Sequence, residues 1–338
     1  MIKWLEGPRK DEDVVVSTRI RVARNIENYK FPQYINLEES KELTDEILNG
    51  MKKISGDDNY RFIRINDLTP RERFVYIEEH LISPSLVQKV DKSSFLLRND
   101  EKVTIMINEE DHIRIQVLMP GLNFEEGWQL CTQIDDLLEE NLDYAFHERL
   151  GYLTSCPTNV GTGLRASVMV HLPCLVMTGH INAIVEALSK IGLTVRGIYG
   201  EGSETLGHLF QISNQTTLGE KEESIIKKLN NVIFQVVARE RNIRKNLMEK
   251  KKVEMEDKIF RSFGLLKHSR LMSSKEAMGH LSNVKLGCEM GIINDVASKE
   301  ILKLMVEIQP ASIQANLNKE MTKEERDINR AQLIRNFL

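Results

Sequence analysis

Five arginines lie in segments whose alternating pattern predicts β-strands or strand ends: Arg19, Arg21, Arg114, Arg165 and Arg196. The residues that alternate with them are mostly apolar, so the guanidinium groups should all point to one side of a sheet. Taken singly, each is most simply a solvated or salt-bridged surface residue. Five converging cations, however, require an anion to hold them. Arginine suits a polyphosphate because its fork of donors binds phosphate oxygens bidentately and stays protonated.

Two carboxylates and a thiol lie close to these arginines in the sequence. Glu110 lies four residues before one strand arginine, Glu201 five residues after another, and Cys156 nine residues before a third. Singly, each carboxylate is an ordinary exposed turn residue and the thiol a small buried hydrophobe. Together they form a negative lining that would receive a cation, and a cationic neighbour would favour the thiolate.

The elements that must position these residues are strands mixed with helices. Strands are expected over residues 13–26, in the two runs of 103–119 joined by NEED, over 164–171, in LTVRGIYGEGSE and in HLFQIS. Helices are expected over 37–54, 124–142 and 181–191. The hairpin-like runs favour an α+β fold with a largely antiparallel sheet flanked by helices. The sequence contains neither a G-x-G-x-x-G helix start nor a G-x-x-x-x-G-K-[ST] loop.

The residue pattern of the chain changes near Glu220. A proline-free segment with a helical apolar period continues from there through Leu266, and the rest of the chain is also helical in pattern. We therefore predict a catalytic domain over residues 1–240 and a small all-helical domain over 241–338, connected by a long helix.

Composition excludes several classes of protein. The 338 residues include 46 Lys and Arg against 50 Asp and Glu, a net charge of −4, which argues against a general nucleic-acid binder. No apolar run has the length of a membrane span, and the N-terminus turns acidic before a signal-type apolar region develops. The four widely spaced cysteines favour free thiols, and no His or Cys spacing suggests a metal site. We expect a cytoplasmic protein without membrane or direct nucleic-acid partners.

Four motifs carry a family resemblance. STRIRVARN, NEEDHIRI, CPTNVGTGLRASV and VRGIYGE, in this order, resemble the ATP:guanido phosphotransferases, the arginine and creatine kinase family. Within the family the chain is most similar to the bacterial protein-arginine kinases. The arginine motif begins at Ser17, without the helical N-terminal domain of small-substrate members; Met169 stands where the family usually has His; and RDINRA near the C-terminus resembles the phosphoarginine-binding motif of those kinases.

The resemblance implies a role for each motif. It implies that Glu110 is the base, that Glu201 orients the acceptor guanidinium and that Cys156 lies beside it. Mg²⁺ would be held mainly through the ATP phosphates. The implied ATP-binding residues are Ser17, Thr18, Arg19, Ile20, Arg21, His80, Arg114, Arg165, Ala166, Ser167, Val168, Met169, Arg196, Gly197, Ile198, Tyr199, Gly200 and Glu201. The implied allosteric phosphoarginine site comprises Arg326, Asp327, Arg330 and Ala331.

The activity implied is ATP-dependent phosphorylation of arginine side chains in proteins, in the stress response and in marking proteins for Clp proteolysis. Implied partners are the activator McsA, the Clp unfoldase–protease, the repressor CtsR and a second copy of the chain in a dimer. Two alternatives remain open: a kinase of free arginine or another small guanidine, and a non-catalytic phosphoarginine-binding adaptor. The missing N-terminal domain counts against the first alternative, and the retained arginines, glutamates and cysteine count against the second.

Overall fold

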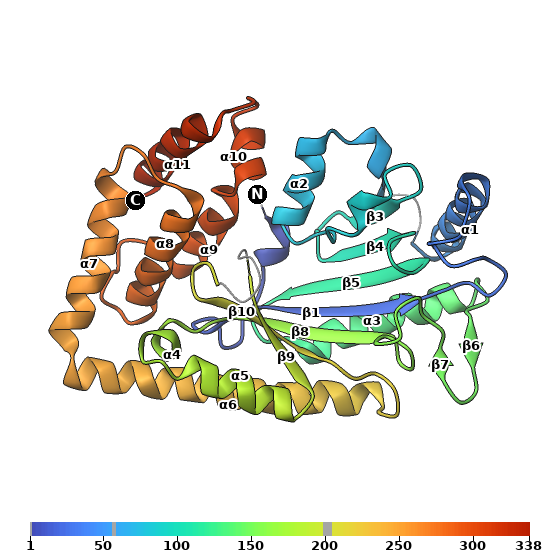
Figure 1. The fold of residues 1–338 in the computed structure, drawn as a ribbon, viewed down its shortest axis with the longest axis horizontal. Helices are drawn as coiled ribbons and strands as arrows, with labels where there is room; N and C mark the ends of the chain where they lie inside the picture. Colours follow the sequence, from blue (N-terminus) through green and yellow to red (C-terminus); the bar gives the residue numbers. More distant parts are fainter. Residues whose placement is uncertain (1, 56–58, 199–204) are drawn as a thin grey trace.

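A computed structural model describes residues 2–55, 59–198 and 205–338 (Figure 1). Eight strands of these residues form one antiparallel sheet in the order β2-β3-β4-β5-β1-β8-β10-β9, with β1 near its centre. Their bounds are β1 Val15–Arg24, β2 Tyr60–Arg64, β3 Ser94–Arg98, β4 Val103–Ile107, β5 Ile113–Pro120, β8 Leu164–His171, β9 Leu193–Gly197 and β10 Leu209–Asn214. A separate hairpin pairs β6 Phe146–His147 with β7 Gly151–Tyr152. The predicted antiparallel α+β fold is confirmed.

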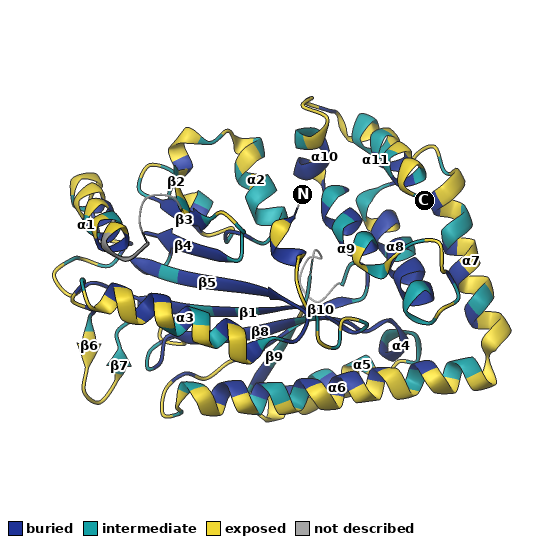
Figure 2. Cartoon of the chain, turned by 180° about the vertical axis from the view of Figure 1, so that it is seen from behind, coloured by how far each residue is buried: buried dark blue, intermediate teal, exposed yellow. Residues whose placement is uncertain are grey.

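Helices cover one face of this sheet. The covering helices are α1 Leu37–Ser55, α3 Phe124–Glu139, α4 Pro173–Met177, α5 Ile181–Lys190 and α6 Glu222–Lys250. Ile20 and Val22 of β1, which alternate with arginines, lie in the same buried core as Ile134 of α3 and Ile233 of α6. Figure 2 shows that α3 and α6 present a buried stripe to the sheet and an exposed stripe outward. One face of β1 is thus fully used for packing, and only the other remains for a ligand.

Among the described residues, elements cover the opposite face only at its ends. The short helix α2, Pro70–Glu78, packs there over the β3 and β4 side together with three 3₁₀ turns, Lys3–Leu5, Ile65–Asp67 and Leu86–Gln88. At the other end of the strands lies a helical bundle: α7 Lys252–His268, α8 Ser274–Glu289, α9 Ser298–Glu307, α10 Pro310–Asn316 and α11 Lys323–Phe337. Val16 and Leu209 of the sheet belong to the core of that bundle.

The long helix differs from the prediction in one respect. The proline-free segment is broken at Lys251, whose backbone leaves the helical region (φ −140°, ψ 35°), so that α6 and α7 are separate helices. Residue 240, the predicted domain boundary, lies within α6, and α6 itself packs on β8 and β10. Among the described residues, no helix combines the length and apolarity needed to cross a membrane. All four cysteines are free thiols.

Candidate active site

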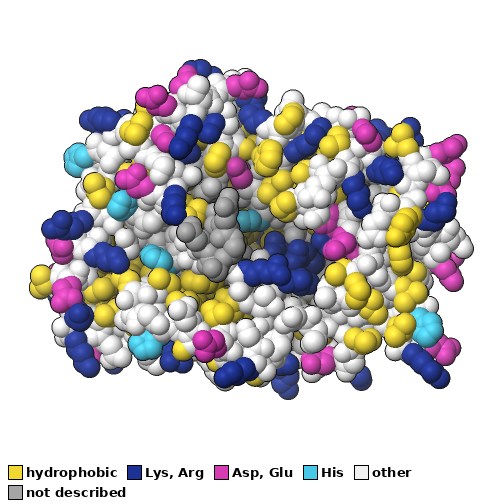
Figure 3. All heavy atoms as spheres, viewed as in Figure 1, with side chains coloured by type: hydrophobic (Ala, Val, Ile, Leu, Met, Phe, Trp, Pro, Cys, Tyr) yellow, Lys and Arg dark blue, Asp and Glu magenta, His cyan; other side chains and the backbone are white. Residues whose placement is uncertain are grey.

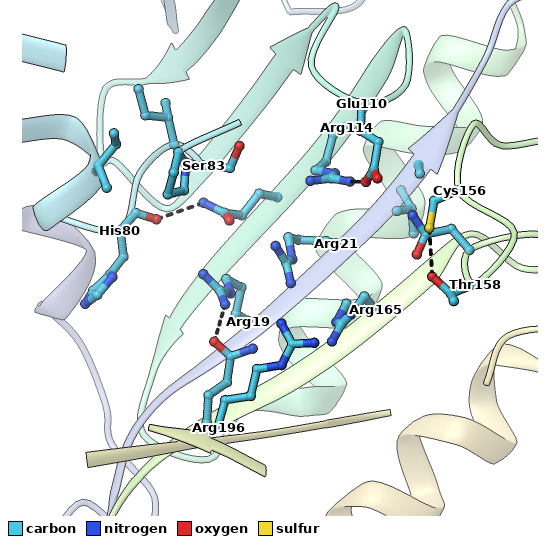
Figure 4. Close-up of a pocket in the computed structure, with 18 of the residues that line it drawn as sticks. Arg19, Arg21, His80, Ser83, Glu110, Arg114, Cys156, Thr158, Arg165 and Arg196 are labelled. Atoms are coloured by element: carbon cyan, nitrogen blue, oxygen red, sulfur yellow. Dashed lines mark hydrogen bonds and ion pairs between the residues drawn. The ribbon is translucent and has the colours of Figure 1, made fainter. Parts of the chain in front are cut away.

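The antiparallel register places two arginines directly opposite each other. Arg21 of β1 is the cross-strand partner of Arg165 in β8, and on its other side it faces Gln116 of β5. Arg19 lies two residues away on the same face of β1 and is opposite Ser167. The predicted convergence of Arg19, Arg21, Arg114, Arg165 and Arg196 is seen in Figure 4, where all five reach the same space from neighbouring strands.

These side chains line a cleft of about 710 Å³ on the open face of the sheet. Figure 3 shows basic side chains gathered near the middle of this face of the molecule. At one end the cleft is bounded by Ile77, Glu78 and His80 at the end of α2, and at the other by Glu110 and Cys156. The cleft therefore has a cationic centre between two chemically different ends.

Burial makes the arginine cluster costly without an anion. Burial, with the charges of Arg165 and Arg114, lowers the pKa of Arg19 to about 10. Burial and the neighbouring arginines also lower the pKa values of Arg21 and Arg165. The Nε atoms of Arg21 and Arg165 are buried without a hydrogen-bond partner among the described residues. Native proteins seldom leave such donors unpaired, so the cluster carries a desolvation cost that an anion bound in the cleft would offset.

The arginine side chains differ in their hydrogen-bond partners. Arg19 Nη2 donates to Gln211 Oε1 at 2.5 Å, and Arg165 Nη2 lies 3.4 Å from Ser213 Oγ. Arg196 is exposed on β9, where it pairs in register with Gln211. The side-chain contacts of Arg19 and Arg165 come from β10, so this strand helps to orient two of the guanidinium groups.

Arg114 connects the cationic centre to the acidic end of the cleft. Its Nη2 donates to Glu110 Oε2 at 2.8 Å, and its Nη1 lies 2.5 Å from Glu109 Oε2. The side chain of Glu110 is 40% exposed, whereas that of Glu109 is 1% exposed and also accepts a hydrogen bond from Ser83. The buried Glu109 thus fixes Arg114, and the accessible Glu110 faces the cleft.

Asp111 ties the carboxylates to the cysteine loop. Its Oδ1 accepts from Asn25 Nδ2 at 2.8 Å and from the backbone N–H of Ser155 at 2.6 Å. Cys156 follows immediately, and its Sγ lies 3.0 Å from Thr158 Oγ1. Asp111 is fully buried. The Asp111 carboxylate, which is not exposed in the cleft, therefore connects the turn that carries Glu110 to the loop that carries Cys156.

Glycines allow the cysteine loop to pass close to β1. Gly163 has φ +66°, and a Cβ atom there would lie 2.6 Å from the carbonyl oxygen of Ala23. Gly161 has φ +111°, and its Cβ would lie 2.5 Å from the carbonyl oxygen of Thr217. Only glycine combines this backbone conformation with so close an approach. The loop glycines set the path that leads from Cys156 into the strand of Arg165.

His80 lies at the end of the cleft remote from Cys156. It adopts a left-handed conformation (φ 63°) just after α2, and Gln116 Nε2 donates to its carbonyl oxygen at 3.0 Å. Burial, together with the charge of Arg19, lowers its pKa to about 3, so the imidazole is neutral at physiological pH. A small separate pocket beside it shares Arg19, His80 and Gln211 with the cleft and is also lined by Ser17, Leu118, Ser167 and Met169.

Some predicted ATP-binding residues have side chains on the other face of the sheet. Ile20, Ala166 and Val168 belong to the helix-covered core. Thr18 Oγ1 donates to the carbonyl oxygen of Gly121 at 2.8 Å. The side chains of these residues are therefore absent from the cleft, because neighbours in a strand alternate between faces. Gly197 and Ile198 do line the cleft, whereas Tyr199, Gly200 and Glu201 lie outside the described residues.

Other residues of the site were missed from the sequence. Glu109 and Gln211 contact arginines, Gln116 lies opposite Arg21 in the sheet, and Asp111 holds the loop just before Cys156. Gln116 lies two residues after Arg114 on the same strand face, and Gln211 stands in a predicted strand, so polar positions on the arginine face were the available signal. The burial of Glu109 beside the exposed Glu110 had no signal in the sequence, because it depends on how the turn after β4 bends.

The C-terminal motif lies on α11. Arg330 is 1% exposed, and it donates to the carbonyl oxygens of Ile308 at 2.8 Å and Met272 at 2.9 Å and to Asp327 Oδ1 at 2.5 Å. Arg326 Nη1 donates to the carbonyl oxygen of Met321. Ala331 is buried, and Arg326 and Asp327 are partly exposed. Arg330 therefore holds α11 to the rest of the bundle, a role that its sequence spacing did not indicate.

Comparison with known proteins gives consistent results along the chain. Residues 41–243 match the C-terminal catalytic domain of the ATP:guanido phosphotransferases, and residues 252–338 match the C-terminal domain of the protein-arginine kinase McsB. The protein-arginine kinase of Halothermothrix orenii is 49% identical over 99% of this chain and 96% of the relative. That of Clostridium tetani is 45% identical over 100% of this chain and 99% of the relative.

Solved structures support the same assignment. Lombricine kinase matches with a TM-score of 0.60 and 28% identity, covering 73% of this chain and 71% of the other. The name of this structure denotes a kinase, and the family models denote phosphotransferases and kinases. Both fit a cleft whose arginines can bind phosphate groups. The chain therefore belongs to the ATP:guanido phosphotransferase family, in the branch of the protein-arginine kinases.

Proposed function

We propose that this kinase transfers the γ-phosphoryl group of ATP to protein arginine side chains across the arginine-lined cleft. The phosphates lie over Arg19, Arg21 and Arg165, with Arg114 and Arg196 at the sides. The observation that carries this proposal is the convergence of five arginines on one cleft, with Arg21 and Arg165 directly opposite each other in β1 and β8. A polyphosphate would accept hydrogen bonds from these guanidinium groups and neutralise the opposed charges.

The two ends of the cleft divide the remaining work. His80, Ser167 and Met169 lie near the nucleoside, since His80 lines the end of the cleft remote from Cys156 and the other two residues line the small pocket beside it. Glu110 and Cys156 receive the acceptor guanidinium, because they supply the accessible negative or polarisable groups at the other end. Glu201, which lies outside the described residues, orients that guanidinium.

The reaction requires a base. A guanidinium has a pKa above about 12 and no free lone pair, so it must lose a proton as it attacks. In the proposed step an acceptor nitrogen forms a bond to the γ-phosphorus, the bond from phosphorus to the bridging oxygen breaks, and ADP departs with that oxygen. Glu110 takes the proton. Its ion pair with Arg114 leaves further lone pairs on the carboxylate to accept it.

Mg²⁺ enters with ATP as part of the substrate. The described residues contain no group of three His, Cys, Asp or Glu side chains that could hold a metal ion. Oxygen ligands are what Mg²⁺ prefers, and a cationic lining is unsuited to bind it directly. The ion is therefore held mainly through the phosphates, where it and the arginines neutralise charge on the transferred group.

We assign phosphoarginine binding to Arg326, Asp327, Arg330 and Ala331 of the C-terminal domain. Two guanidinium groups offer donors to a phosphate and Asp327 offers an acceptor to the guanidine, which together match both halves of this ligand. Arg330 already has backbone partners, so the partly exposed Arg326 and Asp327 make the first contacts. Membership of the branch supports McsA, the Clp unfoldase–protease and CtsR as partners, a dimer, a role in the stress response and a cytoplasmic location.

A comparison of acceptors tests this function. Casein and free arginine are incubated separately with the protein and MgATP, and acid-labile phosphoarginine is measured by mass spectrometry. We expect phosphorylation of casein arginines with a much higher kcat/KM than that of the free amino acid. Preferred phosphorylation of free arginine supports the small-guanidine alternative, and binding of phosphoarginine without any transfer supports the adaptor.

A further inference from the structure

Glu78 connects the wall of the nucleotide cleft to the C-terminal bundle. It is the last residue of α2 and lines the cleft together with Ile77 and His80. Its carboxylate accepts from the backbone N–H groups of Ala311 at 2.9 Å and Ser312 at 2.7 Å, and from Ser312 Oγ at 2.7 Å. Both partners belong to α10, which lies more than two hundred residues away in the sequence.

These contacts give the first backbone N–H groups of α10 a hydrogen-bond acceptor from outside its own domain. The first N–H groups of a helix have no partner within the helix, and a side chain of the preceding residue usually accepts from them. Here the N-cap residue Gln309 makes no side-chain cap, so the carboxylate of Glu78 takes its place. Hydrogen bonds with an ionised acceptor are among the stronger ones in proteins. The contact is therefore a specific joint between α2 and α10 rather than incidental packing.

Each side of this joint is tied to further structure. On the catalytic side, the chain leaves α2 through hydrogen bonds from His80 N to Ile77 O and from Leu81 N to Tyr76 O. The conformation of His80 consequently follows the end of the helix that Glu78 anchors. On the other side, Arg330 Nε donates to the carbonyl oxygen of Ile308, which fixes the start of α10 to α11.

We infer that Glu78 is a positioning residue through which the C-terminal bundle holds the α2 wall of the nucleotide cleft in its ATP-binding arrangement. When the joint is broken, α2 and His80 occupy this arrangement for only part of the time. The apparent affinity for ATP then falls in proportion to the fraction of molecules in this arrangement. The chemistry at Glu110 is unaffected once ATP is bound.

Ser312 is the best position for the test because it contacts Glu78 but does not line the cleft. We expect Ser312→Ala to raise the Kd and KM for ATP roughly threefold to tenfold, with kcat within about twofold of wild type, because one charge-assisted hydrogen bond is lost and two remain. Glu78→Gln should raise the same constants further, and combining it with Ser312→Ala should add little. The Kd is measured by calorimetry without an acceptor, so it does not depend on which guanidine is phosphorylated.

Ser298→Ala is a matched control. Ser298 also donates from a serine hydroxyl to a glutamate, Glu289, but both residues belong to the C-terminal bundle. This variant should bind ATP like wild type. The inference is overturned if Ser312→Ala leaves the Kd for ATP unchanged while Glu78→Gln raises it, since Glu78 would then act on the nucleotide directly. A change in kcat alone, or an equal change in Ser298→Ala, contradicts it as well.

Discussion

Arg21 and Arg165 face each other as cross-strand partners in the β1–β8 ladder, and both side chains enter the cleft. Like charges directly opposite in a sheet destabilise it, and burial adds to the cost. On the helix-covered face of β1, Ile20 and Val22 pack in the main core, so the fold gains stability there and tolerates the repulsion on the open face. The opposed pair is best explained by the ligand that it binds.

Arginine geometry at this pair should matter more than charge. Arg165→Lys keeps the cation but loses the planar fork that makes bidentate contacts. We expect kcat/KM for ATP to fall by roughly two orders of magnitude or more, because contacts to the transferred phosphoryl group typically have effects of this size. Steady-state kinetics with varied ATP measures this fall. Full activity in the lysine variant would show that screening of charge is sufficient at this position.

The repulsion should also be visible in stability. Arg21→Gln removes one of the opposed charges, and we expect the unfolding midpoint of the ligand-free protein to stay equal or rise by a few degrees, as about 1 kcal/mol of repulsion is relieved. The variant should lose the stabilisation that MgATP gives to wild type. Thermal denaturation with and without MgATP measures both effects. A large destabilisation of the ligand-free variant would mean that Arg21 is a structural residue.

Cys156 should be the reactive thiol of the chain. It lines the cleft, whereas burial raises the pKa of Cys174 to about 12 and that of Cys288 to about 11, and it also raises that of Cys131. Iodoacetamide should therefore modify Cys156 first and inactivate the enzyme, and MgATP with an arginine peptide should slow both events. Peptide mapping by mass spectrometry identifies the modified residue. Preferential labelling of any other cysteine would refute this prediction.

Asp327 tests the C-terminal site separately from catalysis. Asp327→Ala removes the acceptor proposed to contact the guanidine of phosphoarginine and also a partner of Arg330. We expect calorimetry to show loss of phosphoarginine binding at this site, while phosphorylation of casein without added phosphoarginine is retained. Repeating the titration in an Arg165→Lys background, which impairs the catalytic cleft, distinguishes binding at α11 from binding in that cleft. Equal affinity and stoichiometry in wild type and variant would exclude Asp327 from the site.

The sequence predicted the parts of the site that follow from periodicity. Arg19, Arg21 and Arg165 alternate with apolar residues, so their shared face could be predicted, and the antiparallel pairing of β4 with β5 followed from the NEED turn. The opposition of Arg21 to Arg165 depends on register between strands far apart in the chain, which local patterns do not specify. The contact of Glu78 with α10 and the burial of Arg330 also depend on tertiary packing. From the sequence, charged residues in amphipathic helices are expected to face solvent.

Glu110→Gln gives the most direct test of the proposed chemistry. The amide is nearly isosteric and Glu109 still holds Arg114, but the base is lost. Initial rates are measured with MgATP labelled at the γ-phosphorus and casein, together with the Kd for ATP, and with Glu148→Gln as a control at an exposed position on the β6–β7 turn. We predict that Glu110→Gln binds ATP like wild type and forms phosphoarginine about a hundredfold or more slowly, the range expected for loss of a general base. Turnover close to that of wild type would contradict the account.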